Sequence, residues 1–207
     1  LEHQKLNKFG YTKVYYSSYS GKQKKGVAIL ISNQVTFEQS FMHKDKEGRY
    51  ILVKGNINGQ MFTLLNVYAP PRADIAFYTN IMDLIANHSE GTLINGGDYN
   101  LHSQPSLDVS NTNTTIKTIN HKFRKLLQNI GLIDIWREIN PNTRQYTHFS
   151  TPHNVYTRID YFFIFNRDRS KIINADIGTI DLSDHAPIYI TIELDEKQKN
   201  TLWRFNT

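Results

Sequence analysis

The sequence contains no cysteine among its 207 residues. This absence excludes disulfide bonds, thiolate nucleophiles and cysteine-ligated zinc, so any metal must bind to oxygen or imidazole ligands. Long apolar runs are absent too, and a run such as residues 27–31 is far too short to span a membrane. No signal-peptide core opens the chain. We therefore expect a protein that is not secreted and has no membrane partner.

A strong charge imbalance is also lacking. The formal net charge is +5 and the isoelectric point is about 9.2. This mild excess favours a polyanionic partner, but many basic proteins bind no nucleic acid. The length fits one domain, which we expect to span residues 1–207 and to be monomeric.

Strand-like patterns outnumber helical ones. Period and turn signals predict strands at residues 26–32, 50–57, 61–68, 91–95, 157–165 and 186–194, and helices at residues 75–87 and 115–130. Asn58-Gly59 predicts a tight hairpin, Gly96-Gly97 a sharp turn and residues 103–113 a polar loop. Because helices fall between strands, we expect an α/β sandwich with sheet on sheet and helices outside.

Reactive side chains gather where the predicted strands end or begin. Asp98 and Asn100 follow the glycine pair, and residues two apart in an extended segment can address one phosphate. Both residue types also stabilise turns without any catalytic role. Tyr68 ends its strand before Ala69-Pro70, a place where a tyrosine is more often part of the core or its rim.

A second group lies late in the chain. Asp184-His185 directly precede a predicted strand, which suits an acid/base pair, although such a pair is common by chance. Asp160 leads into an aromatic strand, where it can either hold the His185 imidazole in one tautomer or cap the strand.

In series these clusters are far more specific. Tyrosine before Ala-Pro, then Gly-Asp-x-Asn, Arg-Ile-Asp and Ser-Asp-His resembles the motif order of the endonuclease/exonuclease/phosphatase superfamily, which includes apurinic endonucleases, DNase I and inositol polyphosphate phosphatases. A narrower resemblance, running from Phe9 to Asn206, is to the endonuclease domain of vertebrate long interspersed element retrotransposons. It rests on residues 21–30, 45–50, 131–136 and 202–206.

The resemblance implies a four-layer α/β sandwich of the DNase I type, with two packed, mostly antiparallel sheets flanked by helices. It implies hydrolysis of a DNA phosphodiester with Mg²⁺, or Mn²⁺ as the alternative ion. The nick would leave a 3′-hydroxyl that primes reverse transcription. The implied partners are double-stranded DNA and a covalently linked reverse transcriptase domain, and the implied place of action is the nucleus.

Catalytic roles follow from the same resemblance. Asp98 would orient or deprotonate the attacking water, and Asn100 would hold the phosphate. His185 would stabilise the phosphate charge or act as the base, and Asp160 would orient His185. These roles suit phosphoryl transfer, which needs a placed water and a neutralised phosphate.

The remaining roles concern metal and DNA. Asp184 would lie at the metal, and Tyr68 would hydrogen-bond the phosphate. Residues 146–158 resemble a hairpin that these endonucleases lay against the minor groove, where width and A·T content are sensed; an ordinary hairpin is the alternative. The candidate DNA contacts are Thr147, Arg158 and Ser183.

The sequence also departs from the family pattern. An early Asn and a metal-binding Glu are not found, and Pro71 stands where many relatives have Asn. We therefore expect a domain truncated at its N-terminus, with its first strands missing and little activity of its own. Two alternatives stay open: a phosphatase of the same fold, and a non-catalytic DNA-binding relic or host-adopted copy.

Overall fold

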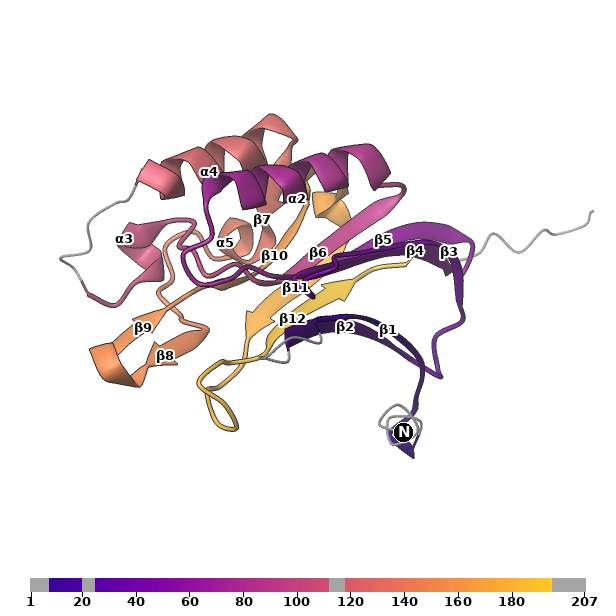
Figure 1. Cartoon of the computed structure of the whole chain (residues 1–207), viewed down its shortest axis with the longest axis horizontal. Helices are drawn as coiled ribbons and strands as arrows, with labels where there is room; N and C mark the ends of the chain where they lie inside the picture. Colours follow the sequence, from indigo (N-terminus) through magenta and orange to yellow (C-terminus); the bar gives the residue numbers. More distant parts are fainter. Residues whose placement is uncertain (1–7, 20–24, 112–117, 195–207) are drawn as a thin grey trace, which may run out of the picture.

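A computed structural model describes residues 8–19, 25–111 and 118–194 (Figure 1). The strands are β1 (Tyr11–Tyr19), β2 (Lys25–Ser32), β3 (Phe37–Lys44), β4 (Tyr50–Ile57), β5 (Gln60–Tyr68), β6 (Thr92–Asp98), β7 (Leu132–Asp134), β8 (His148–Ser150), β9 (Val155–Thr157), β10 (Asp160–Phe165), β11 (Ile172–Ile177) and β12 (Ile188–Ile192). The helices are α2 (Ile75–His88), α3 (Pro105–Asp108), α4 (Thr118–Asn129), α5 (Ile135–Ile139) and the 3-10 turns η1 (Thr151–His153) and η2 (Asn166–Lys171).

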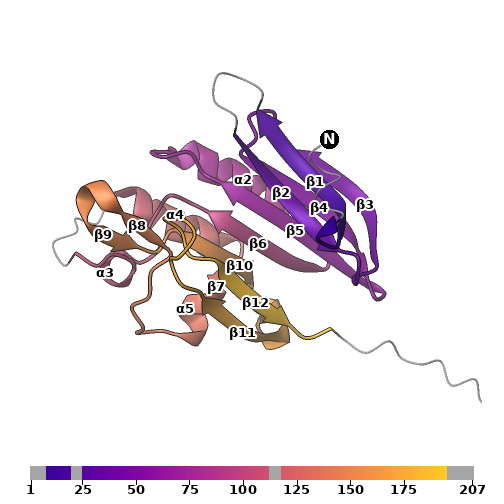
Figure 2. The same cartoon turned by 90° about the horizontal axis from the view of Figure 1, so that it is seen from below.

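A central sheet organises the molecule. Its strand order is β3-β4-β5-β6-β10-β7, with β5 and β6 parallel and the other neighbours antiparallel. Helices α2 and α4 cover one face, and the strand pairs β1-β2 and β11-β12 lie on the other (Figure 1). Seen from below, β1-β2 lies over β4 and β5 while β11-β12 lies over β10, and β6 is visible between the two pairs (Figure 2). The expected α/β class is therefore confirmed.

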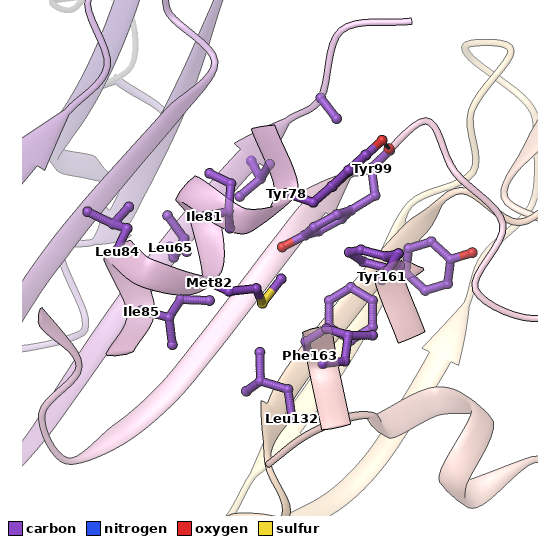
Figure 3. Packing of buried hydrophobic residues seen from close by; sticks show 14 of the residues in the cluster. Leu65, Tyr78, Ile81, Met82, Leu84, Ile85, Tyr99, Leu132, Tyr161 and Phe163 are labelled. Carbon is purple, nitrogen blue, oxygen red and sulfur yellow. Dashed lines mark hydrogen bonds between the residues drawn. The ribbon is translucent and has the colours of Figure 1, made fainter. Parts of the chain in front are cut away.

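Aromatic packing fixes the middle of the sheet. Tyr99 meets the Phe163 ring edge-on at 5.0 Å and the Tyr161 ring at 6.1 Å, and Tyr78 on α2 stacks on Tyr99 with ring centroids 6.5 Å apart (Figure 3). The Tyr78 hydroxyl donates to the Tyr99 carbonyl at 2.8 Å, so even the polar tip is satisfied. Such edge-on pairs add about 0.5–1.5 kcal/mol beyond their burial. This packing holds the ends of β6 and β10 together, and both ends bear candidate site residues.

Most expected elements are present. Asn58 and Gly59 both have positive φ, 54° and 89°, as the predicted hairpin between β4 and β5 requires. Helix α2 begins at the cap Asp74, whose carboxylate accepts from the Phe77 amide at 3.0 Å. Helix α4 ends before Gly131, which adopts φ 75°. The first residues of the second predicted helix, 115–117, lie outside the described ranges.

Three local predictions need correction. Gly96-Gly97 forms no turn, because β6 runs straight through it to Asp98. A side chain at Gly96 would meet the Phe162 ring at 2.6 Å, so the glycine serves close strand packing. The strand predicted at residues 157–165 is interrupted: β9 ends at Thr157 and β10 begins at Asp160. The polar loop at residues 103–113 contains the short helix α3.

No helix in the described ranges is both long enough and apolar enough to cross a membrane.

Candidate active site

Strand register places three candidate residues in one row. Asp98 at the end of β6 is the register partner of Tyr68 on the parallel strand β5 and of Asp160 on the antiparallel strand β10. Register partners on neighbouring strands point to the same face of a sheet. Tyr68 packs with the apolar cluster that includes Val27 of β2, and Asp160 lines a cleft with Ala28, so the row Tyr68–Asp98–Asp160 faces the side on which the strand pairs lie. At its Tyr68 end it borders a cleft of about 320 Å³ that Lys25 and Arg49 also line.

Asn100 is tied back onto Asp98. Its amide nitrogen donates to Asp98 Oδ1 at 2.8 Å, and its side-chain nitrogen donates to Asp98 Oδ2 at 3.0 Å and to the Ala69 carbonyl at 2.8 Å. Asn100 has a φ of 46°, a left-handed conformation that asparagine tolerates better than most residues. The two residues thus stabilise a turn, and they also present one fixed carboxylate and one fixed amide group at the middle of the row.

His185 contacts Asp160, which forms one end of the row. Its Nδ1 lies 2.8 Å from Asp160 Oδ2. This hydrogen bond raises the pKa of His185, and it outweighs the opposing effect of burial. With Nδ1 engaged, Nε2 is the nitrogen left to address a ligand. The geometry is that of a carboxylate orienting an imidazole.

Asp98 has an unusual acidity. Burial raises its pKa to about 6, and the nearby Asp160 carboxylate adds to the shift. The Asn100 amide and His185 oppose the shift but do not cancel it. A carboxylate with a pKa near 6 can accept a proton close to neutral pH, which suits a general base.

The loop that bears His185 is anchored to β8. The Phe149 amide donates to the Asp184 carbonyl at 2.9 Å, and the Ala186 amide donates to the Thr147 carbonyl at 2.7 Å. Ser183 is exposed; its hydroxyl donates to Asp184 Oδ1 at 3.0 Å and accepts from the His185 amide at 3.1 Å. The backbone is fixed, while the Asp184 side chain remains 69% exposed.

Two of the expected DNA contacts need correction. Thr147 is fully buried, and its hydroxyl oxygen accepts from the amides of Ile159 and Asp160, both at 3.1 Å. Arg158 is 1% exposed and pairs with Asp134 at 2.6 Å and Asp108 at 2.9 Å. Neither side chain is free to reach a DNA surface. Both are instead structural. The Thr147 hydroxyl positions Asp160 through its backbone amide, and Arg158, just before β10, belongs to a buried network of ion pairs.

Sequence reasoning missed His148. Its ring lies 4.7 Å from the ring of His185, centroid to centroid, because the two residues form an isolated antiparallel bridge. Burial lowers the pKa of His148, and the neighbouring His185 lowers it further. No local motif identifies this contact, since it depends on a pairing between positions 37 residues apart, 185 minus 148.

The acidic groups suit a divalent cation. The carboxylates of Asp160 and Asp184 both raise the pKa of Asp98, so negative charge exceeds what His185 balances. Mg²⁺ prefers carboxylate and water oxygens. Asp184, exposed beside this cluster, is the residue that would hold such an ion, with water completing its shell. Among the described residues, no glutamate joins Asp184 in a group with metal-ligand spacing.

Fold and site together define an α/β sandwich with an acid–imidazole centre. The chain belongs to the endonuclease/exonuclease/phosphatase family, which it matches over residues 1–185. It is similar to a Xenopus laevis protein described as the transposon TX1 uncharacterized 149 kDa protein, with 27% identity over 194 residues. That match covers 87% of this chain but only 14% of the transposon protein, so the chain spans a small part of that relative.

Solved structures show the same fold. The endonuclease domain of TRAS1, a telomere-specific non-LTR retrotransposon, matches with a TM-score of 0.67 and 18% identity over 88% of this chain and 80% of that one. The catalytic domain of Xenopus laevis APE2 matches at 0.71 and 20%, covering 89% and 76%. An AP endonuclease from Archaeoglobus fulgidus matches at 0.70 and 19%, covering 94% and 84%. The expected resemblance and fold are confirmed.

Proposed function

We propose that this chain is a Mg²⁺-dependent DNA endonuclease domain that nicks its target to give a 3′-hydroxyl. The observation that supports the proposal most is the row Tyr68–Asp98–Asp160 with His185 held on Asp160 at 2.8 Å. It combines a proton acceptor, an oriented imidazole and a phenol on one face, next to an exposed carboxylate. Phosphodiester hydrolysis needs groups of these types in one place.

The chemistry assigned to these residues is simple. Asp98 takes a proton from water as the water oxygen attacks phosphorus, and the bond from phosphorus to the 3′-oxygen breaks. The 3′-oxygen leaves as an alkoxide that takes a proton from solvent water to become the 3′-hydroxyl, and the 5′-phosphate keeps the new oxygen. His185, kept cationic over a wider pH range by Asp160, faces the charge that develops on the phosphate. A divalent cation held by Asp184 would supply further neutralisation of that charge.

Positioning groups complete the proposed site. Asn100, kept in place by the Ala69 carbonyl, would transfer to a phosphate oxygen the N–H that it donates to Asp98. The Tyr68 hydroxyl would donate a hydrogen bond to the same phosphate. Lys25 lines the cleft beside Tyr68, where it would contact a flanking phosphate of the DNA backbone; Arg49, which also lines the cleft, is paired with Asp45 at 2.7 Å. Ser183 is the surviving candidate for direct DNA contact from the sequence-based set, since it is exposed next to Asp184.

The wider role follows from the relatives. A transposon protein and a retrotransposon endonuclease domain are among the matches. We propose that the nick primes reverse transcription by a linked reverse transcriptase domain, with double-stranded DNA in the nucleus as the target. Mn²⁺ would substitute for Mg²⁺, as both accept oxygen ligands.

The test is a nicking assay on supercoiled plasmid in Mg²⁺. Because no described glutamate joins Asp184, we expect slow turnover, so the chain is used in excess over DNA. Conversion to the nicked circle should be lost with His185→Ala and kept with His121→Ala, an exposed histidine on α4. The nick should be extended by a DNA polymerase without prior treatment, since a 3′-phosphate would block extension.

Other outcomes separate the rival functions. Release of inorganic phosphate from an inositol polyphosphate, with no nicking, would point to a phosphatase. DNA binding that resists competition, with no nicking in Mg²⁺ or Mn²⁺, would point to a non-catalytic DNA-binding protein. Nicking that survives His185→Ala would overturn the residue roles given above.

A further inference from the structure

His148 stands outside the proposed catalytic groups, yet it lies against them. Its side chain is only 21% exposed, and its ring is 4.7 Å from that of His185. His148 Nε2 lies 3.9 Å from Asp184 Oδ2. The ligand atoms of His148, Asp184 and His185 all lie within 4.8 Å of one another, and these are the described residues with metal-ligand spacing.

Each imidazole is oriented by an oxygen atom at its Nδ1. His185 Nδ1 is 2.8 Å from the Asp160 carboxylate, and His148 Nδ1 is 3.2 Å from the Thr157 hydroxyl. The Asp160 carboxylate only accepts, so it fixes the His185 tautomer and leaves Nε2 for a metal, whereas the Thr157 hydroxyl orients the His148 ring and leaves its Nε2 for a metal when Nδ1 carries the proton. His148 Nε2 faces the Asp184 carboxylate at 3.9 Å, and the contact of His185 Nδ1 with Asp160 leaves His185 Nε2 available to a metal.

We infer that His148, Asp184 and His185 form a binding site for a zinc-type transition-metal ion. Two imidazoles and one carboxylate are a donor set that suits Zn²⁺, Co²⁺ or Ni²⁺, whereas Mg²⁺ prefers oxygen alone. Three protein ligands also leave one position open in a tetrahedral shell. His148 is the residue that adds this preference, because without it the site offers one imidazole among carboxylates.

The geometry needs little movement to close. Bonds of about 2.0–2.1 Å in a tetrahedral shell separate ligand atoms by about 3.4 Å. The present separations of up to 4.8 Å must shorten by as much as about 1.4 Å, given that shell size. The Asp184 side chain is free to move toward an ion, since it is 69% exposed while its backbone is held by β8, and rotation of the imidazole rings supplies the rest.

Such an ion would occupy the imidazole that the proposed reaction needs. Zn²⁺ on His185 would displace the phosphate from it, so Zn²⁺ should inhibit nicking even when Mg²⁺ is in excess. Inhibition rests on the proposed function, whereas metal binding does not. The two can therefore fail separately.

Binding is measured by calorimetric titration of the 207-residue chain with ZnCl₂ and by the visible absorption of CoCl₂, which intensifies in a tetrahedral site. We expect one ion per chain, and about 100-fold weaker binding in His148→Phe, since even loss of an outer partner weakens metal binding 10–100-fold. His153→Phe, an exposed histidine in η1, is the matched control and should bind as the unsubstituted chain does.

A second variant and a second measurement distinguish loss of the metal site from loss of folding in the His148 variants. His148→Gln keeps a polar side chain, and a thermal melt without metal reports whether either variant is folded. In the unsubstituted chain, the Nε2 resonances of His148 and His185 should shift together when ZnCl₂ is added. No Zn²⁺ binding by the unsubstituted chain, equal binding by folded His148 variants, or a shift of His185 alone would overturn the site. Zn²⁺ binding without inhibition would leave the site standing and contradict the role given to His185.

Discussion

At the scale of single residues, the carboxylates of the site carry more negative charge than their neighbours compensate. Asp98 and Asp160 are register partners on neighbouring strands, and like charges in such positions repel. Two interactions reduce this repulsion: His185 contacts the Asp160 carboxylate, and the N–H groups of Asn100 donate hydrogen bonds to the Asp98 carboxylate. The compensation is incomplete, because burial and Asp160 still raise the pKa of Asp98 to about 6. A site that keeps excess negative charge is suited to a cation, and its groups should be sensitive to pH.

Asp160→Asn tests the coupling to His185. Asparagine keeps the shape and can still accept from Nδ1, but it removes the charge that raises the pKa of His185. The pKa of His185 should fall, as measured by NMR titration of the ring protons. His121→Ala, far from the row on α4, should leave this pKa unchanged. An unshifted titration in Asp160→Asn would contradict the assignment.

The same pair makes stability depend on pH. The folded pKa of His185 is raised above its unfolded value of about 6.5. Its contribution to stability is therefore full below about pH 6.5 and is lost as the pH rises through the folded pKa. The free energy of unfolding of the unsubstituted chain, minus that of Asp160→Asn, should be larger at acidic than at alkaline pH. A difference that grows with rising pH would contradict this sign.

Thr147 offers a second residue-scale test. Thr147→Val keeps the shape but removes the oxygen that accepts from the Ile159 and Asp160 amides. Leaving buried amides unpaired costs about 1–3 kcal/mol of unfolding free energy. Thr147→Ser keeps the acceptor and should restore most of it. If Thr147 positions Asp160, the pKa of His185 should also change in the valine variant and recover in the serine variant.

At the scale of elements, the glycines of β6 allow this strand to pack closely against its neighbours, and this packing places Asp98 in the row. Gly97 has a φ of 135°, and a side chain there would collide with the Val67 carbonyl and lie 2.9 Å from the Asn66 side chain. Gly97→Ala should therefore destabilise the fold by about 3 kcal/mol or more, through both strain and overpacking. Gly131→Ala is the matched control: its φ is 75° but nothing lies within 4 Å, so about 1 kcal/mol is expected. Urea denaturation measures both, and equal losses would contradict the argument.

Elements with strong local signals could be predicted, and weaker ones could not. The β4–β5 hairpin and α2 were predicted because Asn58-Gly59 and the apolar stripe of α2 act within a few residues. The glycine pair was read as a turn because glycine marks both turns and close strand contacts, and only the neighbouring Phe162 ring distinguishes the two. Strands β1 and β3 were not predicted, since both are largely exposed and lack a buried apolar pattern.

At the scale of the whole molecule, the site depends on contacts that no local pattern encodes. The order of the motifs was enough to place Asp98, Asp160 and His185 together by resemblance, and the register and hydrogen bonds agree with that grouping. The bridge between His148 and His185 was not predictable, because it arises where β8 meets the loop before β12. Burial of Arg158 was missed for a related reason. An arginine beside a site suggests phosphate binding, and only the fold reveals its partners Asp108 and Asp134.

Arg158→Met distinguishes these two roles for the whole molecule. Arg158 pairs with Asp108 and Asp134, and its guanidinium lies over the rings of Trp136 and Tyr161 at 5.0 and 4.6 Å. Removing one partner of a buried ion pair should cost about 3–5 kcal/mol, measured by chemical denaturation, although methionine fills much of the volume. DNA affinity of the protein that remains folded should fall with salt at an unchanged slope, because no phosphate contact is lost. A phosphate-binding arginine would give the reverse: little change in stability, and a slope of log affinity against log salt that is about 0.9 shallower.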